Sequence, residues 1–202
     1  VYSALDATQA YFNVRISEKS RKVTAFATPN GLYQFRRMPF GLSVSVAVYS
    51  RFIAAALNKL GTRNLNCYLD DVLVFNNSLG DHVSRLREVF QAHREAGVKL
   101  KPVKTLLFQE QIVYLGHTLS KDGIGMVDAY VERIKEWPIP KDVKELNTLL
   151  GFFSYYRNFI PDFASLTATM CKQRREKVLA WTPEMTEKLE LLKAEFSKGP
   201  IR

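Results

Sequence analysis

The sequence predicts an α+β fold: an antiparallel sheet backed by helices, followed by a mostly helical segment. Short apolar runs separated by turn residues fill the middle of the chain, and helical patterns flank one pair of these runs. After residue 127 the pattern becomes helical. A chain of 202 residues with 47% hydrophobic content can bury a substantial core. We therefore expect a first domain at residues 1–127 and a helical second part at residues 128–202.

The first strand is predicted at residues 10–16, where apolar and polar residues alternate with a period of two. Residues 44–60 are apolar and rich in alanine, and they end at Gly61. This pattern is typical of a buried helix with a glycine cap. We expect this helix to pack against the sheet.

Residues 65–69 and 72–75 are apolar runs on either side of Asp70 and Asp71, which predicts a β-hairpin. Aspartate is a common turn residue, so an ordinary hairpin accounts for the pattern. The turn lacks the glycine that favours two-residue hairpins, and two adjacent carboxylates can bind a divalent metal ion. Asp6 is the candidate third carboxylate, expected on a neighbouring strand, with a helix or turn cap as its alternative role.

Ser78 is the predicted N-cap of a helix that continues to Ala96 and stops at Gly97. An apolar stripe marks its buried face: Val83, Leu86, Val89, Phe90 and Ala96. Three β-like runs follow, at residues 98–101, 105–108 and 112–119. Asp122 and Gly123 then predict another turn.

The second part begins with a helix after Asp128, whose apolar face is formed by Val131, Ile134 and Trp137. Prolines at positions 138 and 140 end this helix and suggest a joint. The next helix is predicted from a capping box, in which an Asp is followed three residues later by a Glu, and it runs to about residue 156. The capping residues are Asp142 and Glu145.

Aromatic residues gather at the end of that helix: Phe152, Phe153, Tyr155, Tyr156 and Phe159. A base-stacking surface is one interpretation, but we expect a core cluster. The last helix is predicted to begin with Thr182 as N-cap and Pro183 at its first position, and to end at Gly199-Pro200.

The charge balance favours a polyanionic partner, because 29 Lys and Arg outnumber 20 Asp and Glu to give a net charge of +9. An ordinary basic protein is the alternative. Cys67 and Cys171 lack zinc-site spacing, so we expect reduced thiols and an intracellular protein. No apolar run reaches the ~18 residues that span a bilayer. The isolated histidines, at positions 82, 93 and 117, are expected in surface or packing roles.

Five segments together carry a family resemblance: DATQAYF (6–12), RKVTAF (21–26), MPFGL (38–42), YLDD (68–71) and YLGH (114–117). In this order and spacing they resemble the reverse transcriptase of gypsy-type long-terminal-repeat retrotransposons, which are relatives of retroviruses. The later segments VKEL (143–146), LLGF (149–152) and YYRNFI (155–160) resemble the region that follows the polymerase palm in those Pol polyproteins. The resemblance covers nearly the whole chain.

The resemblance implies an RNA-directed DNA polymerase, a nucleotidyltransferase that adds deoxynucleotides to a primer 3′-hydroxyl on an RNA or DNA template. Its implied cofactors are two Mg²⁺ ions, with Mn²⁺ as a substitute. Catalytic and metal-binding roles fall on Asp6, Asp70 and the more peripheral Asp71. Nucleotide-binding roles fall on Ala7, Tyr11, Phe40, Gly41 and Lys104. Primer-positioning roles fall on Tyr68, Leu115, Gly116 and His117.

Two of these roles have alternatives. Tyr11 is implied to exclude a 2′-hydroxyl from the sugar site, whereas a core aromatic is its plain interpretation. Lys104 is implied to lie near the triphosphate, whereas an exposed loop lysine is the commoner environment. The implied partners are a template–primer, deoxynucleoside triphosphates and the RNase H, protease and integrase domains of a Pol polyprotein, with no membrane. The implied location is the cytoplasm, virus-like particles or the nucleus.

The sequence also departs from the family. Val46 stands where the family has a proline, which we expect to loosen the helix start beside the template base. Only residues 1–5 precede Asp6, where the family has a basic fingers segment, and an RNase H domain is expected to begin near residue 202. We therefore expect an intact metal site but poor or no polymerisation by the isolated chain. The alternative is a truncated, catalytically silent relic or recruited domain that only binds nucleic acid.

Overall fold

The computed structural model describes residues 1–198 and contains two compact units, Val1–Ile112 and Val113–Arg202. The predicted domain boundary, after residue 127, falls later in the chain than this division. The predicted helix end at Gly199-Pro200 lies outside the described residues.

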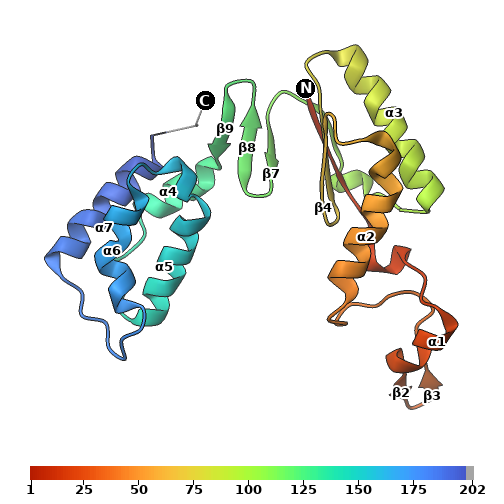
Figure 1. The fold of residues 1–202 in the computed structure, drawn as a ribbon, viewed down its shortest axis with the longest axis horizontal. Coiled ribbons are helices and arrows are strands. Elements are labelled where there is room, and N and C mark those ends of the chain that lie inside the picture. Colours follow the sequence, from red (N-terminus) through yellow and green to blue (C-terminus); the bar gives the residue numbers. More distant parts are fainter. Residues whose placement is uncertain (199–202) are drawn as a thin grey trace. The chain divides into compact units, whose positions relative to one another are not determined.

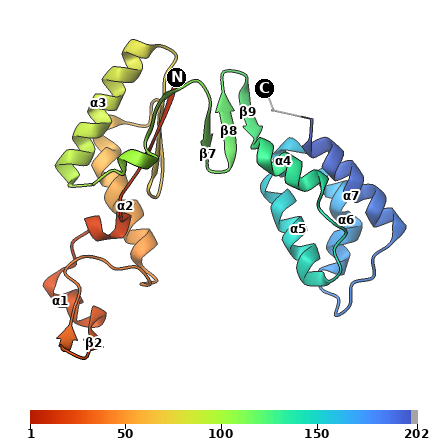
Figure 2. The same cartoon turned by 180° about the vertical axis from the view of Figure 1, so that it is seen from behind.

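The first unit is built on a four-stranded antiparallel sheet with the strand order β4-β5-β1-β6. Figures 1 and 2 show the helices α2 and α3 beside this sheet. Its strands are β1 (Tyr2–Asp6), β4 (Leu65–Tyr68), β5 (Asp71–Phe75) and β6 (Leu106–Gln109). A separate hairpin consists of β2 (Phe26–Thr28) and β3 (Gly31–Tyr33). The helices are α1 (Glu18–Arg21), α2 (Ser45–Leu57) and α3 (Leu79–Ala96), with short 3₁₀ turns at Ala10–Asn13, Lys22–Thr24, Asn58–Leu60 and Pro102–Lys104.

One hydrophobic core joins the sheet to α2 and α3. On α2 the buried residues recur every four positions and are Ser45, Tyr49, Ile53 and Leu57. The helix was predicted to be buried as a whole, but only this face is covered. Val46, its second residue, remains 48% exposed. One stripe of side chains on α2 covers the sheet, so Ala47, Ala54 and Ala55 on the rest of the helix are exposed to solvent.

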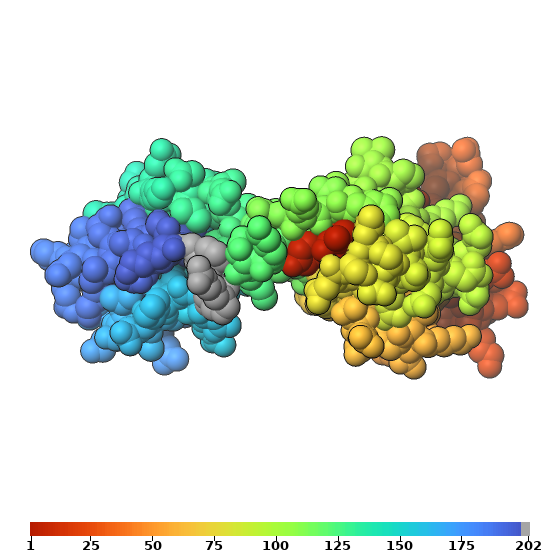
Figure 3. Space-filling view, turned by 90° about the horizontal axis from the view of Figure 1, so that it is seen from above, coloured from red at the N-terminus to blue at the C-terminus, as the bar shows by residue number. Residues whose placement is uncertain are grey.

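Helix α3 begins and ends as the sequence predicts. Ser78 Oγ accepts a hydrogen bond of 3.1 Å from the Asp81 backbone N–H, and Gly97 takes a positive φ of 70°. His82 and His93, predicted to have surface or packing roles, are both buried. Burial lowers the pKa of each imidazole. Figure 3 shows the outer surface of the α3 segment in yellow, beside the red start of β1.

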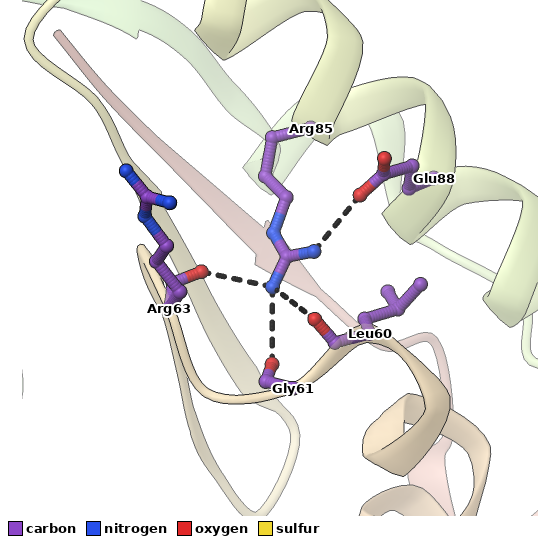
Figure 4. A network of polar contacts seen from close by, with 5 residues as sticks. All are labelled: Leu60, Gly61, Arg63, Arg85 and Glu88. Atoms are coloured by element: carbon purple, nitrogen blue, oxygen red, sulfur yellow. Dashed lines mark hydrogen bonds and ion pairs between the residues drawn. The ribbon is translucent and has the colours of Figure 1, made fainter.

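Arg85 of α3 holds the loop that leads into β4 (Figure 4). Its Nη2 donates to the backbone carbonyls of Leu60, Gly61 and Arg63 at 2.8, 3.0 and 2.8 Å. Its Nη1 donates to Glu88 Oε2 at 2.8 Å. These bonds satisfy carbonyls in the loop, and they connect the start of the β4–β5 hairpin to α3, whose inner face belongs to the core.

The prediction of a strand at residues 10–16 is wrong. Strand β1 ends at Asp6, Gln9 takes a positive φ of 47°, and the chain continues as a 3₁₀ turn. Asn13 stabilises this turn, because its Nδ2 donates to the carbonyls of Thr8 and Ala10, each at 3.1 Å. Apolar residues of this segment, such as Tyr11, Val14 and Ile16, pack against the core from the turn and the residues after it. Their spacing in the sequence therefore resembles the alternation of a strand.

Two of the three predicted β-runs need correction. Residues 98–101 form no strand: Leu100 makes an isolated bridge to Ala7, and Lys101 N–H donates to the Asp6 carbonyl at 2.9 Å. The single run at residues 112–119 is two strands, because Leu115 and Gly116 form a turn with φ values of 47° and 75°. The run at 105–108 is confirmed as β6 with a shift of one residue.

The second unit contains a three-stranded sheet and four helices among its described residues (Figure 1). The strands are β7 (Ile112–Tyr114), β8 (His117–Ser120) and β9 (Gly123–Met126), with the predicted turn before Gly123. The helices are α4 (Asp128–Lys135), α5 (Val143–Tyr155), α6 (Phe163–Gln173) and α7 (Pro183–Phe196), with a 3₁₀ turn at Arg157–Phe159. Helix α6 was not predicted.

The predicted capping residues of the second unit are confirmed. Asp142 Oδ1 accepts from the Glu145 N–H at 2.7 Å, and Thr182 Oγ1 accepts from the Met185 N–H at 3.3 Å. The predicted aromatic core is confirmed for Phe153 and Tyr156, which are buried. It is wrong for Tyr155, which is 56% exposed. Between residues 1 and 198 there is no helix of the length and apolarity needed to cross a membrane.

Candidate active site

Three carboxylates lie at one end of the four-stranded sheet. The β4–β5 turn consists of Leu69 and Asp70, and Leu69 takes a positive φ of 56°, a conformation that glycine adopts more readily. Asp71 is the first residue of β5 and lies opposite Tyr68 in the hairpin. On the other side of β5, Asp71 lies opposite Asp6, the last residue of β1. The fold therefore brings Asp6 beside the Asp70-Asp71 pair.

Ala7 completes this end of the sheet. It is buried, and its N–H donates to the Asp70 carbonyl at 3.3 Å. The two strand ends that carry the carboxylates are therefore connected through backbone groups.

The carboxylates influence one another electrostatically. Burial raises the pKa of Asp71, and the negative charges of Asp70 and Asp6 raise it further, while the Lys104 ammonium lowers it. Burial, followed by the charges of Asp71 and Asp70, raises the pKa of the Cys67 thiol to about 11. Cys67 and Cys171 are both free, as predicted. The end of this sheet therefore carries a concentration of negative charge that favours a cation.

Carboxylate oxygens are the ligands that hard divalent cations prefer, so the donor chemistry of this site fits magnesium or manganese. Within residues 1–198, however, no group of three or more His, Cys, Asp or Glu side chains is arranged to hold a metal ion. Lys104 Nζ instead donates to Asp6 Oδ2 at 3.1 Å. The ligand types are present, and one of them is engaged by a lysine.

The predicted nucleotide-binding residues also lie in the first unit. The Tyr11 ring packs edge-on against Phe40, with 5.3 Å between ring centroids, and against Tyr49, with 5.7 Å. Phe40 is 60% exposed, and Gly41 takes a positive φ of 87°. Tyr49 is fully buried, and burial together with Asp70 raises the pKa of its phenol well above the usual range. Tyr11 is thus held between an exposed and a buried aromatic ring.

The predicted primer-positioning residues are divided between the units. Tyr68 lies in the first unit on β4 and is 58% exposed. Leu115 and Gly116 form the β7–β8 turn of the second unit, and His117 begins β8. The His117 ring stacks on Tyr155 at 5.2 Å and on Phe159 at 5.5 Å. The packing role expected for His117 is therefore confirmed.

Two tyrosines of the second unit hold the β7–β8 turn. Tyr155 Oη donates to the Leu115 carbonyl, and Tyr156 Oη donates to the Gly116 carbonyl at 2.8 Å. The same residues line a pocket of about 460 Å³ together with Arg133 of α4 and Trp137. Sequence reasoning assigned the tyrosines to the core and missed this role. The sequence signal for this role was the presence of two tyrosines, whose hydroxyl groups need hydrogen-bond partners, in a cluster that is otherwise apolar.

Replacing Gly116 with alanine is expected to destabilise the second unit by about 1–2 kcal/mol, because L-residues disfavour a φ of +75°. The added Cβ would also lie 3.3 Å from Tyr156 Oη. Gly151 in α5 is the matched control, since a Cβ there meets no atom within 4 Å and helical Gly→Ala stabilises by about 0.5–1 kcal/mol. Urea unfolding followed by tryptophan fluorescence measures both. Destabilisation of equal size by the two substitutions would contradict the role of the turn.

The comparisons with known proteins identify relatives over the whole chain. The model of a family described as "Reverse transcriptase (RNA-dependent DNA polymerase)" matches residues 1–119. The retrovirus-related Pol polyprotein from transposon 297 of Drosophila melanogaster is 33% identical over 202 residues, which are 99% of this chain and 19% of that protein. The transposon Tf2-3 polyprotein of Schizosaccharomyces pombe is 28% identical over 202 residues, 100% of this chain and 15% of that protein. The chain thus spans less than a fifth of these relatives.

Solved structures share the fold. The foamy viral protease-reverse transcriptase dRH in complex with double-stranded DNA superimposes with a TM-score of 0.89 at 24% identity, over 98% of this chain and 35% of that one. The foamy viral protease-reverse transcriptase in complex with an RNA/DNA hybrid gives a TM-score of 0.86 at 24% identity, over 98% of this chain and 27% of that one. This likeness agrees with the α+β fold predicted from the sequence.

Proposed function

Because this chain belongs to the reverse transcriptase (RNA-dependent DNA polymerase) family, we propose that it carries the catalytic carboxylates of an RNA-directed DNA polymerase. The observation that carries this proposal is the position of Asp6 opposite Asp71, beside the turn that holds Asp70. Asp6 and Asp70 are the proposed ligands of two divalent ions, with Asp71 as the more peripheral carboxylate. Residues 1–127 are proposed as the palm and residues 128–202 as the start of thumb and connection.

The proposed reaction is attack of a primer 3′-hydroxyl on the α-phosphorus of a deoxynucleoside triphosphate, with pyrophosphate as the leaving group. Divalent ions bound to the carboxylates would neutralise the charge that develops on the entering and leaving oxygens. The backbone bond from Ala7 to Asp70 keeps the two strand ends together, so Asp6 and Asp70 can act on one ligand. We also propose that Ala7 offers its backbone carbonyl beside the nucleotide.

Tyr11 is the proposed selector of the sugar. Its ring is fixed by Phe40 and Tyr49, so it cannot easily rotate away from a 2′-hydroxyl. Phe40 and Gly41 are proposed to lie against the incoming nucleotide, where the exposed ring of Phe40 offers an apolar contact. These roles come from the matching positions of the family and are supported by the packing around Tyr11.

Tyr68 is proposed to contact the primer, and a primer-contacting role is proposed separately for the turn formed by Leu115, Gly116 and His117. The net charge of +9 supports binding to the phosphate backbone of a template–primer. The similar foamy viral proteins are described in complex with double-stranded DNA and with an RNA/DNA hybrid, which supports the same ligand class here. Because the relatives are polyproteins, we propose that RNase H, protease and integrase domains accompany this chain in a full-length Pol polyprotein. The proposed location of that polyprotein is the cytoplasm, virus-like particles or the nucleus.

Primer extension under single-turnover conditions tests the proposal. The chain is mixed in excess with a labelled DNA primer on an RNA template and one complementary deoxynucleotide, with Mg²⁺ or with EDTA. We expect Mg²⁺-dependent addition of one nucleotide, and slow addition agrees with the poor activity predicted for the isolated chain. Binding of the template–primer, measured in parallel by fluorescence anisotropy, should occur in both conditions.

The alternative function is nucleic-acid binding without catalysis. The basic net charge favours it, since backbone contacts need no metal ion. This alternative predicts that the chain binds a template–primer with an affinity that falls as the salt concentration rises. It also predicts no nucleotide addition at any Mg²⁺ or Mn²⁺ concentration. The extension assay therefore separates the two functions directly.

A further inference from the structure

An ion pair occupies one of the proposed metal ligands. Lys104 Nζ lies 3.1 Å from Asp6 Oδ2. The Asp6 side chain is 20% exposed, while that of Lys104 is 58% exposed. The carboxylate is therefore held in the protein, and the ammonium reaches it from the solvent side.

The backbone around Lys104 brings its side chain to Asp6. Lys101 N–H donates to the Asp6 carbonyl at 2.9 Å, and Thr8 N–H donates to the Lys99 carbonyl at 2.7 Å. Lys104 then ends the 3₁₀ turn that begins at Pro102, and its own N–H donates to the Lys101 carbonyl at 3.1 Å. Lys104 therefore lies three positions after Lys101, whose backbone is bonded directly to Asp6. The ion pair follows from this local architecture.

An ammonium group and a metal ion compete for the same oxygen. A carboxylate oxygen that accepts a hydrogen bond from Lys104 offers less negative charge to a divalent cation, and the positive charge of the lysine repels that cation. No group of three or more potential ligand side chains is arranged for a metal within residues 1–198. Lys104 Nζ already donates to Asp6 Oδ2 at 3.1 Å.

We propose that Lys104 is the resident counter-ion of Asp6 and that a divalent cation must displace its ammonium from Oδ2 in order to bind. This inference rests on the proposed function, because it requires that the carboxylates bind divalent cations. The Lys104 side chain is more than half exposed, so the ammonium can leave without unpacking the core. The released ammonium stays on a tethered turn beside the site, where it can meet the negative charge of a triphosphate.

Direct binding of Mn²⁺ to the 202-residue chain, in the absence of nucleotide and nucleic acid, tests the proposal. Free Mn²⁺ is measured by electron paramagnetic resonance during titration. Replacing Lys104 with methionine keeps the length of the side chain and removes its charge. We expect Lys104→Met to bind Mn²⁺ about two- to fivefold more tightly than the wild type, the range that a partly exposed ion pair supports.

Three matched variants complete the experiment. Lys104→Arg keeps the charge and should retain the wild-type affinity. Lys101→Met removes a charge from the same loop, but Lys101 reaches Asp6 through its backbone, so its effect should be smaller. Asp6→Asn removes the proposed ligand and should weaken binding in every background. Circular dichroism confirms that each variant is folded.

The outcomes separate the inference from the function on which it rests. If Asp6→Asn weakens Mn²⁺ binding but Lys104→Met does not tighten it, the metal site stands and the counter-ion role of Lys104 is overturned. Equal tightening by Lys101→Met and Lys104→Met overturns it too, because general charge then accounts for the effect. If neither wild type nor Lys104→Met binds Mn²⁺, or Asp6→Asn has no effect, the proposed metal site itself fails, and the inference fails with it.

Discussion

Replacing Asp70 with asparagine is expected to lower Mg²⁺-dependent primer extension by about 10²- to 10³-fold. A bound metal ion contributes several kcal/mol of transition-state stabilisation, and each ~1.4 kcal/mol corresponds to a tenfold change in rate. Asparagine has nearly the shape of aspartate but a neutral side chain, so it is a poor ligand for a hard cation. The bond that Asp70 accepts from Ala7 uses the backbone carbonyl and survives the substitution.

Template–primer binding supplies the second readout for Asp70→Asn. Binding should stay within about twofold of the wild type, because phosphate contacts depend on the basic surface and not on this carboxylate. Asp122→Asn, an exposed turn residue of the second unit, is the control and should change neither readout. Extension at the wild-type rate by Asp70→Asn would rule out Asp70 as a metal ligand. Loss of binding together with extension would point to misfolding of the hairpin.

Replacing Leu189 with alanine is expected to destabilise the second unit by about 2–5 kcal/mol. Leu189 is 0% exposed on α7 and belongs to the hydrophobic core of that unit. The substitution removes buried methyl groups and leaves a cavity that the surrounding helices fill only in part. Leu191 on the same helix is 47% exposed, so Leu191→Ala should change stability by no more than about 0.5 kcal/mol.

Tryptophan fluorescence makes this measurement specific to the second unit. The chain has 2 tryptophans, and both Trp137 and Trp181 pack against the core that contains Leu189. Urea unfolding of the two alanine variants, followed at the tryptophan emission, compares a buried with an exposed leucine in one helix. Similar unfolding midpoints for the two variants would show that α7 is not packed as described.

The elements that sequence reasoning located best are those with chemical signals at their ends. Ser78 and Gly97 enclose α3, and Asp142 and Thr182 begin α5 and α7, because a cap is decided by residues within three or four positions. The prediction at residues 10–16 failed for the opposite reason. A positive φ at Gln9 turns the chain out of the sheet, and no residue pattern indicates this conformation for glutamine.

The candidate site shows the same division. The YLDD segment and Asp6 identified the carboxylates from residue types and order, and the structure places Asp6 opposite Asp71. The ion pair of Lys104 with Asp6 and the bonds of the tyrosines to the β7–β8 turn were not predicted. Each of these contacts joins segments that are distant in the sequence, so local patterns carry no information about them.

By itself the sequence determined the family, the α+β class, the caps of the main helices and the three candidate carboxylates, because these depend on residue identity and short-range spacing. Only the tertiary structure decided which strands pair, that Asp6 lies opposite Asp71, and that a lysine engages the first carboxylate. Strand register and long-range contacts come from packing a buried face and closing long loops, and their free energy depends on the whole unit and not on any one window of sequence.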